Sequence, residues 1–286
     1  MRRRLLATLA IALLASGCGT TTPEQQPASA QGAQKIVSLS PSATEMLFAI
    51  GAGKQVVAVD EYSNYPPQAP KTDLSGFTPN AEAIAAKSPD LVVLSADTKG
   101  IKAQLETLKI PVYITGDAKT IDDTYAQIAE LGKRTGHSSE AEALNKQLKD
   151  DLAKLVKDLP KREKPLTYFY ELDPVLYTAT SKTFIGSLFT MAGLVNVADA
   201  ADTAGTGYPQ LTAEALIKSN PDMIFLADTI MGETPDKVKA RAGWNTINAV
   251  SKGNVVALDS DIASRWGPRV VDLMRAIVDA VAKAQA

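Results

Sequence analysis

The same residue pattern occurs twice in this sequence, at residues 81–94 and again at residues 213–226, with identical spacing. Each copy has Ala-Glu-Ala and an apolar residue, then a Pro-Asp pair, then four apolar residues. The offset is 132 residues (214 − 82). We interpret each copy as a short helix, a turn and a buried strand. A unit repeated once at about half the chain length predicts two similar lobes, because a solenoid would stack several repeats.

Two similar lobes enclose a cleft where they meet. The repeat also places one glutamate, Glu82 or Glu214, at the matching point of each lobe. A carboxylate fixed near a helix start on each lobe can register a docking protein through charge-assisted hydrogen bonds. The alternative is that both are first-turn glutamates favoured by the helix dipole.

The N-terminus has the pattern of a bacterial export signal. Residues 2–4 are arginines, and residues 5–14 form an apolar run, with Thr8 as its one polar residue, that is too short to span a bilayer. The sequence Ala-Ser-Gly-Cys then ends at Cys18 and is typical of a lipobox. We predict a signal peptide over 1–17, a lipidated Cys18 and a flexible linker over 18–33. An uncleaved anchor or an ordinary buried cysteine is the alternative. The protein is thus expected to be lipid-anchored at the outer face of the cytoplasmic membrane.

Cys18 is the only cysteine, so the exported domain has no disulfide framework and depends on its hydrophobic core. Removing the signal leaves 269 residues (286 − 17), enough for two lobes of ordinary size. The net charge of −2 argues against nucleic acid as a partner. We expect a monomer.

Short β-rich runs alternate with helical patterns along the chain. This order predicts an α/β fold with parallel sheets, in two Rossmann-like lobes over 34–137 and 161–286. Residues 42–45 and 139–142 each have the spacing of a capping box. The expected strands are 36–40, 56–60, 91–94, 112–115, 167–170, 223–226 and 255–258.

A long helix is predicted over 138–160, midway between the two repeats. Its leucines fall on one helix face, at positions 144, 148, 152, 155 and 159. A helix of this length spans about 30 Å, enough to join the lobes and brace the cleft. The alternative is a surface helix of the first lobe.

The chain resembles a known family at several places. It is similar to the helical-backbone substrate-binding proteins of ABC importers. The similarity lies in residues 36–45 (IVSLSPSATE), residues 62–67 (YSNYPP), the Asn-Ala-Glu sequence at residues 80–82 and the long central helix. Those proteins carry iron-siderophores, haem or vitamin B12. The resemblance covers residues 34–283. It implies a non-enzymatic protein without a resident cofactor or metal, which docks through Glu82 and Glu214 on a permease dimer driven by its ATPase.

Ligand-binding residues are expected on loops after the strands, where open α/β sheets bind their ligands. Aromatic side chains in such loops present flat faces to a large ligand, although each alone can equally belong to a small hydrophobic cluster. The candidates are Ser40, Tyr62, Tyr65, Phe77, Tyr177, Phe184, Tyr208, Asp261, Arg265, Trp266 and Arg269.

Within the family, these loops are most similar to those of vitamin B12-binding members, and this implies a corrinoid ligand. There, Asp261 and Arg265 would meet the amide groups of the corrin rim. A ferric siderophore is the alternative, with Arg265 and Arg269 pairing with its oxygens, unless Arg269 forms a structural salt bridge. Haem is a third candidate, held by a cleft tyrosine, since His137 lies in a predicted turn.

A hydrolase is the remote alternative. The chain has no Gly-x-Ser-x-Gly motif, its one cysteine lies in the lipobox, and its one histidine is His137. A Ser-His-Asp triad would need that histidine to reach the cleft. The sequence therefore predicts a binding protein.

Overall fold

The computed structural model describes residues 32–284. Residues 32–286 form a compact unit of their own. The predicted signal peptide, the lipidation site Cys18 and nearly all of the predicted linker lie outside the described residues. Between residues 32 and 284, no helix is both long and apolar enough to cross a bilayer.

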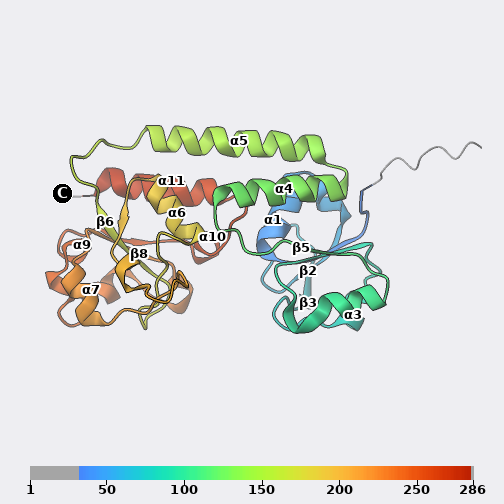
Figure 1. Cartoon of the computed structure of the whole chain (residues 1–286), viewed down its shortest axis with the longest axis horizontal. Coiled ribbons are helices and arrows are strands. Elements are labelled where there is room, and N and C mark those ends of the chain that lie inside the picture. Colours follow the sequence, from blue (N-terminus) through green and yellow to red (C-terminus); the bar gives the residue numbers. More distant parts are fainter. Residues whose placement is uncertain (1–31, 285–286) are drawn as a thin grey trace, which may run out of the picture. The chain divides into compact units, whose positions relative to one another are not determined.

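The N-terminal lobe is built on a parallel sheet with the strand order β3-β2-β1-β4-β5 (Figure 1). Strands β1 and β4 are buried along their whole length, as expected for central strands covered on both faces. The strands are β1 (Ile36–Leu39), β2 (Val56–Asp60), β3 (Lys71–Leu74), β4 (Leu91–Leu94) and β5 (Val112–Ile114). The helices are α1 (Pro41–Ala49), η1 (Ala52–Gln55), α2 (Ala81–Ala85), η2 (Thr98–Gly100), α3 (Ile101–Thr107) and α4 (Ile121–Thr135).

The C-terminal lobe repeats this plan with a parallel sheet in the order β7-β6-β8-β9. The predicted α/β fold with two parallel sheets is confirmed. The strands are β6 (Thr167–Glu171), β7 (Val195–Asn196), β8 (Met223–Leu226) and β9 (Val255–Ala257). The helices are α6 (Phe184–Met191), η3 (Asp199–Ala201), α7 (Ala213–Ser219), η4 (Thr229–Met231), α8 (Pro235–Lys239), η5 (Trp244–Thr246), α9 (Asn248–Ser251), α10 (Ser260–Ala263) and α11 (Val270–Lys283).

Helix α1 begins earlier than the predicted capping box at 42–45. Ser40 is its N-cap and accepts a hydrogen bond from the Ala43 amide at 3.4 Å, and Pro41 is the first helical residue. Proline is well suited to that position because its φ is already helical and it has no amide hydrogen to satisfy. Glu45 therefore lies within the helix and is only 3% exposed, so it does not cap the helix.

The second predicted capping box, at 139–142, is also absent from the described structure. Helix α5 (Ser138–Lys157) follows His137, whose side chain makes no capping bond. The reciprocal capping box lies instead at the start of α4, where Thr120 and Asp123 bond each other's backbone amides. The Ser/Thr-x-x-Asp/Glu spacing alone does not determine at which of several polar residues a helix begins.

Helix α5 runs above α4 and α11, which lie along it one after the other (Figure 1). Helix α4 belongs to the N-terminal lobe and α11 to the C-terminal lobe, so α5 spans both. Its inner face is apolar, and Leu148 and Leu152 are buried there. The helix ends at Lys157, short of Pro160.

One hydrophobic core runs through both lobes. It joins Ile36 and Val59 of the first sheet to Tyr168 and Phe225 of the second, by way of the packed helices. In the C-terminal lobe, Tyr168 stacks on Phe189 with ring centroids 4.3 Å apart. A shared core and a spanning helix resist independent movement of the lobes.

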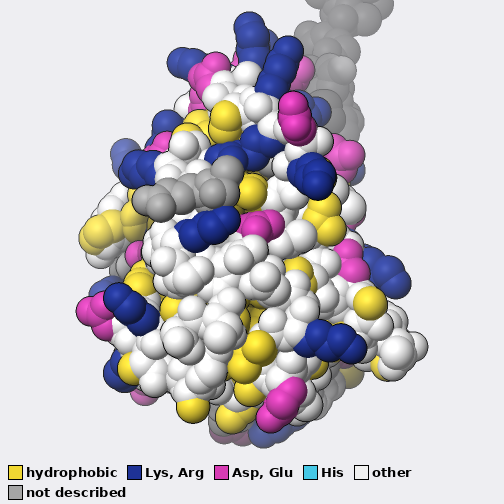
Figure 2. Space-filling view, turned by 90° about the vertical axis from the view of Figure 1, so that its left-hand side faces the viewer, with side chains coloured by type: hydrophobic (Ala, Val, Ile, Leu, Met, Phe, Trp, Pro, Cys, Tyr) yellow, Lys and Arg dark blue, Asp and Glu magenta, His cyan; other side chains and the backbone are white. Residues whose placement is uncertain are grey.

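The outer end of the C-terminal lobe carries charges of both signs. In Figure 2, Lys and Arg side chains are scattered among Asp and Glu across the described residues of this face. This distribution agrees with the small net charge of −2.

Candidate ligand-binding cleft

A cavity of about 700 Å³ opens between the lobes. Its walls come from the carboxyl ends of strands in both sheets, for example Leu39 at the end of β1 and Ala227 just after β8. Parallel α/β sheets bind ligands at this edge. The volume is in the range of small-molecule sites.

The predicted ligand residues divide into two groups. Some line the cavity: Ser40, Tyr62, Phe77, Asp261, Arg265 and Trp266. The others are absent from its lining: Tyr65, Tyr177, Phe184, Tyr208 and Arg269.

Tyr62 and Phe77 form the aromatic part of the N-terminal wall. Their rings meet edge to face, with centroids 5.5 Å apart and planes at 87°. Both are exposed, Tyr62 at 54% and Phe77 at 71%. A paired, exposed aromatic surface inside a cavity suits the apolar face of a ligand.

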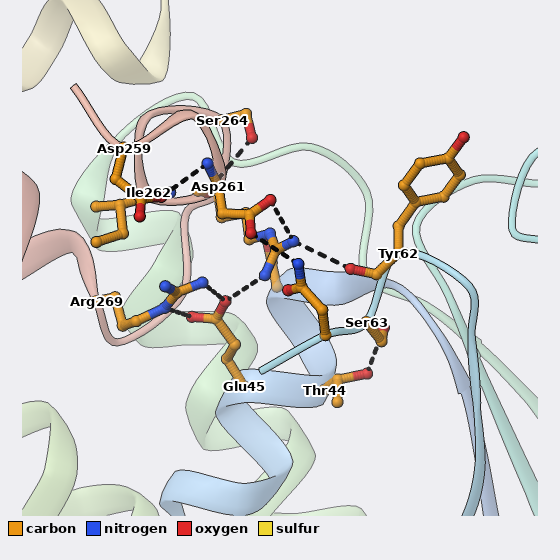
Figure 3. A network of polar contacts seen from close by, with 12 residues as sticks. Thr44, Glu45, Tyr62, Ser63, Asp259, Asp261, Ile262, Ser264 and Arg269 are labelled. Atoms are coloured by element: carbon orange, nitrogen blue, oxygen red, sulfur yellow. Dashed lines mark hydrogen bonds and ion pairs between the residues drawn. The ribbon is translucent and has the colours of Figure 1, made fainter. Parts of the chain in front are cut away.

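Figure 3 shows a polar network that joins the two lobes and includes Glu45, Asp261 and Arg269. Arg265 belongs to this network. Its guanidinium donates to Glu45 Oε1 at 2.9 Å, to Asp261 Oδ1 at 2.9 Å and to the Tyr62 carbonyl at 3.0 Å. Asp261 in turn accepts a hydrogen bond from the side-chain amide of Asn64 at 2.7 Å. Arg265 is 7% exposed, so these bonds form largely out of water.

Arg269 completes this network from the start of α11. It donates through Nε and a terminal nitrogen to the two oxygens of Glu45. Its guanidinium also lies 4.2 Å from the centre of the Tyr65 ring, a cation–π contact. Gly267 approaches Glu45 closely, because a Cβ there would lie 2.9 Å from Oε2. The sequence offered no signal for Glu45 as the common partner of both arginines.

The network is electrically balanced. Two arginines, 265 and 269, face two carboxylates, 45 and 261. Their charges are therefore matched within the protein, and the geometry gives Arg269 the structural role that was the alternative to ligand contact. Among the described residues that line the cavity, Arg265 is the only one with a basic side chain.

Trp266 is positioned by the N-terminal lobe although it belongs to the C-terminal one. Its indole Nε1 donates to Gln127 Oε1 at 3.0 Å, and its carbonyl accepts from the Thr124 hydroxyl at 3.0 Å. Its backbone amide donates to the Ser42 hydroxyl at 3.3 Å. These bonds fix the ring in the cavity wall.

The C-terminal tyrosines lie outside the cavity lining but are accessible. Tyr177 is 43% exposed, and its backbone forms an isolated antiparallel β-bridge with Gln210. Tyr208 is 53% exposed. Partial burial raises the pKa of Tyr208, and the negative charge of Asp117 in the opposite lobe adds to the effect. Phe184, by contrast, is buried in the shared core.

Among the charged residues that line the cavity, acidic ones outnumber basic ones. Asp60, Asp117 and Asp261 line it. Burial raises the pKa of Asp60, and hydrogen bonds from Ser63 partly oppose that rise. The cavity is therefore rich in acceptors and poor in free cations.

Behind the C-terminal wall lies a second acidic cluster that sequence analysis missed. Arg241 pairs with both oxygens of the buried Glu171 and with Glu233. Asp228 is 1% exposed, and its oxygens have no hydrogen-bond partner within the protein. Burial, with the charge of Glu171 second, raises the pKa of Asp228 to about 7.

Glu82 and Glu214 occupy equivalent local positions. Each is the second residue of a short helix, α2 or α7, and each is exposed. The preceding N-caps, Asn80 and Thr212, accept from the amides of Ala83 and Ala215. Both carboxylates therefore stand free at a helix start.

Across residues 32–284, no group of three or more His, Cys, Asp and Glu side chains is arranged to hold a metal ion. His137 precedes α5, with Nδ1 3.8 Å from Glu140, and is not among the cavity-lining residues.

A family model described as "Periplasmic binding protein" matches residues 36–262. An uncharacterised ABC transporter substrate-binding lipoprotein of Bacillus subtilis is 33% identical over 262 residues, which cover 87% of this chain and 80% of the relative. A cobalamin-binding protein of Halobacterium salinarum is 29% identical over 262 residues, covering 86% and 69%.

Solved structures agree in fold. The periplasmic vitamin B12-binding protein of Vibrio cholerae superposes with a TM-score of 0.73 at 28% identity, covering 88% of this chain and 98% of that one. A possible iron-binding periplasmic solute-binding protein of Staphylococcus epidermidis gives a TM-score of 0.76 at 28% identity, covering 88% and 99%.

Proposed function

The chain belongs to the periplasmic binding protein family, and on that premise we propose that it captures a corrinoid and delivers it to the permease of an ABC importer. Proteins of this family are non-enzymatic components of transport systems. Binding and release are then the whole mechanism.

The observation that carries the choice of ligand is the charge of the cavity. The charge of Arg265 is matched by Glu45 and Asp261, while Asp60 and Asp117 add acceptors to the wall. An anionic chelate, such as a carboxylate or catecholate siderophore, would need free cations in the wall. The amide rim of a corrinoid instead donates N–H groups, which carboxylates accept.

The aromatic wall supports the same ligand class. Tyr62 and Phe77 present about half or more of their surface to solvent in the absence of ligand. A macrocycle placed against them would bury this apolar area, at roughly 25 cal/mol per Å². The cobalamin-binding and vitamin B12-binding names of two of the proteins compared above point the same way.

Haem is the second candidate, and Tyr62 favours it. Its phenol is exposed in the cavity, and tyrosine oxygen is a known iron ligand. The haem propionates would still lack a free cation among the described cavity residues. The iron-binding description of the Staphylococcus epidermidis structure keeps iron chelates in the test below.

Permease docking is assigned to Glu82 and Glu214. Their equivalent positions at the starts of α2 and α7, with neither side chain lining the cavity, support a role toward a partner. We further propose that the mature protein is anchored to the outer face of the cytoplasmic membrane through Cys18.

Fluorescence provides the test, because Trp266 lies in the cavity wall while Trp244 is buried in the C-terminal lobe. Residues 32–286 are titrated with cyanocobalamin, haemin, a ferric catecholate and a ferric hydroxamate. We expect quenching by cyanocobalamin at micromolar protein, reduced in Trp266→Phe and retained in Trp244→Phe. Calorimetry checks each affinity. Absence of cyanocobalamin binding, with binding of an iron chelate, would overturn the choice of ligand.

A further inference from the structure

The turn η4 places an unusually exposed aliphatic side chain at the C-terminal wall of the cavity. Ile230 is 80% exposed and is among the residues that line the cavity. Its neighbour Met231 is 61% exposed but is not among them. Single exposed apolar residues are common on protein surfaces, so exposure alone does not assign a role to Ile230.

The backbone under Ile230 is held firmly. The Thr229 hydroxyl donates to the Leu258 carbonyl at 2.8 Å and lies 2.8 Å from the Ser260 hydroxyl. Ser260 Oγ also accepts from the Ile230 amide at 3.1 Å. Gly232 closes the turn with φ +83°, a conformation that glycine adopts without strain. Ile230 is thus an exposed apolar group on an ordered support, so little backbone entropy is lost when a ligand contacts it.

Ile230 extends from the lobe opposite the aromatic pair. Phe77 and Tyr62 form the N-terminal wall of the same cavity, and all three side chains are more than half exposed. Ser260, which holds η4 in place, is the first residue of α10, and Asp261 follows it in that helix. Both lobes therefore present apolar side chains to the cavity, and aspartates of both lobes line it as well.

We propose that Ile230 is a specificity-determining ligand contact that works with Phe77, and that the two select ligands with an apolar face toward each lobe. This inference rests on the proposed function as an importer binding protein. It adds a residue and a selection rule: a flat metal chelate with apolar surface on two sides is accepted, and a strongly hydrated chelate is disfavoured.

Ile230 and Met231 form a matched pair for the test. Both are exposed apolar residues of the same turn, and one of them lines the cavity. Four variants of residues 32–286 are prepared: I230A, I230D, M231A and M231D. We expect I230A to weaken cyanocobalamin binding about tenfold and I230D considerably more, measured by calorimetry. M231A and M231D should bind within about twofold of wild type. All four should keep the wild-type Tm, because neither side chain belongs to the core.

Three outcomes separate this inference from the proposed ligand. Equal affinities for the Ile230 and Met231 variants would overturn the contact role of Ile230, even if the wild type binds cyanocobalamin. Normal binding by I230D with reduced uptake in reconstituted vesicles would also overturn it and assign Ile230 to permease docking. If the wild type binds haemin or a ferric hydroxamate in place of cyanocobalamin, the corrinoid assignment fails. The contact role then stands if I230D weakens that ligand more than M231D does.

Discussion

Arg265 of the C-terminal lobe donates to Glu45 of helix α1 at 2.9 Å, although 220 residues separate them in the chain. Arg269 binds the same carboxylate. Glu45 is 3% exposed and is therefore a single buried anion that holds two cations of the opposite lobe. The contact joins α1 of one lobe to the segment between α10 and α11 of the other, so it helps to hold the two lobes together.

Removing this anion should destabilise the whole unit. Glu45→Gln removes the carboxylate that pairs with Arg269 and one of the two that pair with Arg265, and breaking a buried pair from one side costs about 3–5 kcal/mol. We expect Tm to fall by roughly 10 °C. The control is Lys146→Ala, which breaks an exposed pair with Asp150 at 2.6 Å and should leave Tm unchanged. Similar Tm values for the two variants would contradict the role of Glu45.

Phe77 and Arg269 should respond differently to truncation. Phe77→Ala removes an exposed cavity aromatic, so corrinoid affinity should fall by ~1–3 kcal/mol with Tm unchanged. Arg269→Ala removes a structural pair, so it should lower Tm more than affinity. Calorimetry and thermal denaturation measure both quantities.

Salt dependence provides the contrast for the same two variants. A corrinoid held by apolar contact should bind with weak dependence on ionic strength, whereas an anionic siderophore held by arginine would lose affinity as salt rises. A larger affinity loss in Arg269→Ala than in Phe77→Ala, together with steep salt dependence, would favour the siderophore.

Asp228 should make stability depend on pH. Its pKa is raised from 3.8 to about 7 in the folded state. Between those values the folded protein binds one more proton than the unfolded chain, so stability falls as pH rises from about 4 to about 7. Above pH 7 the loss is complete. Asp228→Asn should therefore gain several degrees in Tm relative to wild type at pH 8 and little at pH 4.

The control for this pH profile is Asp279→Asn, an exposed aspartate of helix α11. Its difference from wild type should not change between pH 5 and 8. A constant difference for Asp228→Asn between pH 5 and 8 would contradict the raised pKa of Asp228, because it would show that no proton is lost there over this range.

The proposed docking role of the two repeat glutamates predicts a separation of binding from transport. Glu82→Ala combined with Glu214→Ala should bind ligand as the wild type does but abolish uptake in vesicles that contain the permease. The control removes the exposed Glu106 and Glu142, which are not related by the repeat. Normal uptake by the first double variant, or loss of its ligand binding, would reject the docking assignment.

The proposed lipid anchor predicts that Cys18→Ser releases the folded protein from membranes. Because residues 32–286 form a compact unit by themselves, we expect the released protein to keep the Tm and affinity of the wild type. Membrane fractionation measures release. Persistent membrane association after cleavage of the signal would argue for another anchor.

The two-lobe α/β plan follows from local patterns in the sequence. The repeat at 81–94 and 213–226 became helix and strand in both copies, as α2 with β4 and α7 with β8. This prediction succeeded because a Pro-Asp turn before four apolar residues, and leucines on one helix face, are local patterns that hold regardless of tertiary contacts. Tyr62 and Phe77 were found in the same way, because each follows the end of a strand, β2 or β3.

Packing between the lobes determines which of those loop residues line the cavity and which hold the lobes together, and the sequence patterns do not show it. Glu45 fits a capping box by spacing, and Arg269 is equally compatible with a ligand or a salt bridge. Their pairing depends on how helix α1 packs against the start of α11 across the interface. The unpartnered Asp228 beside Glu171 is likewise a product of packing. Charge pairing between distant segments depends on burial and distance, which one-dimensional spacing does not contain.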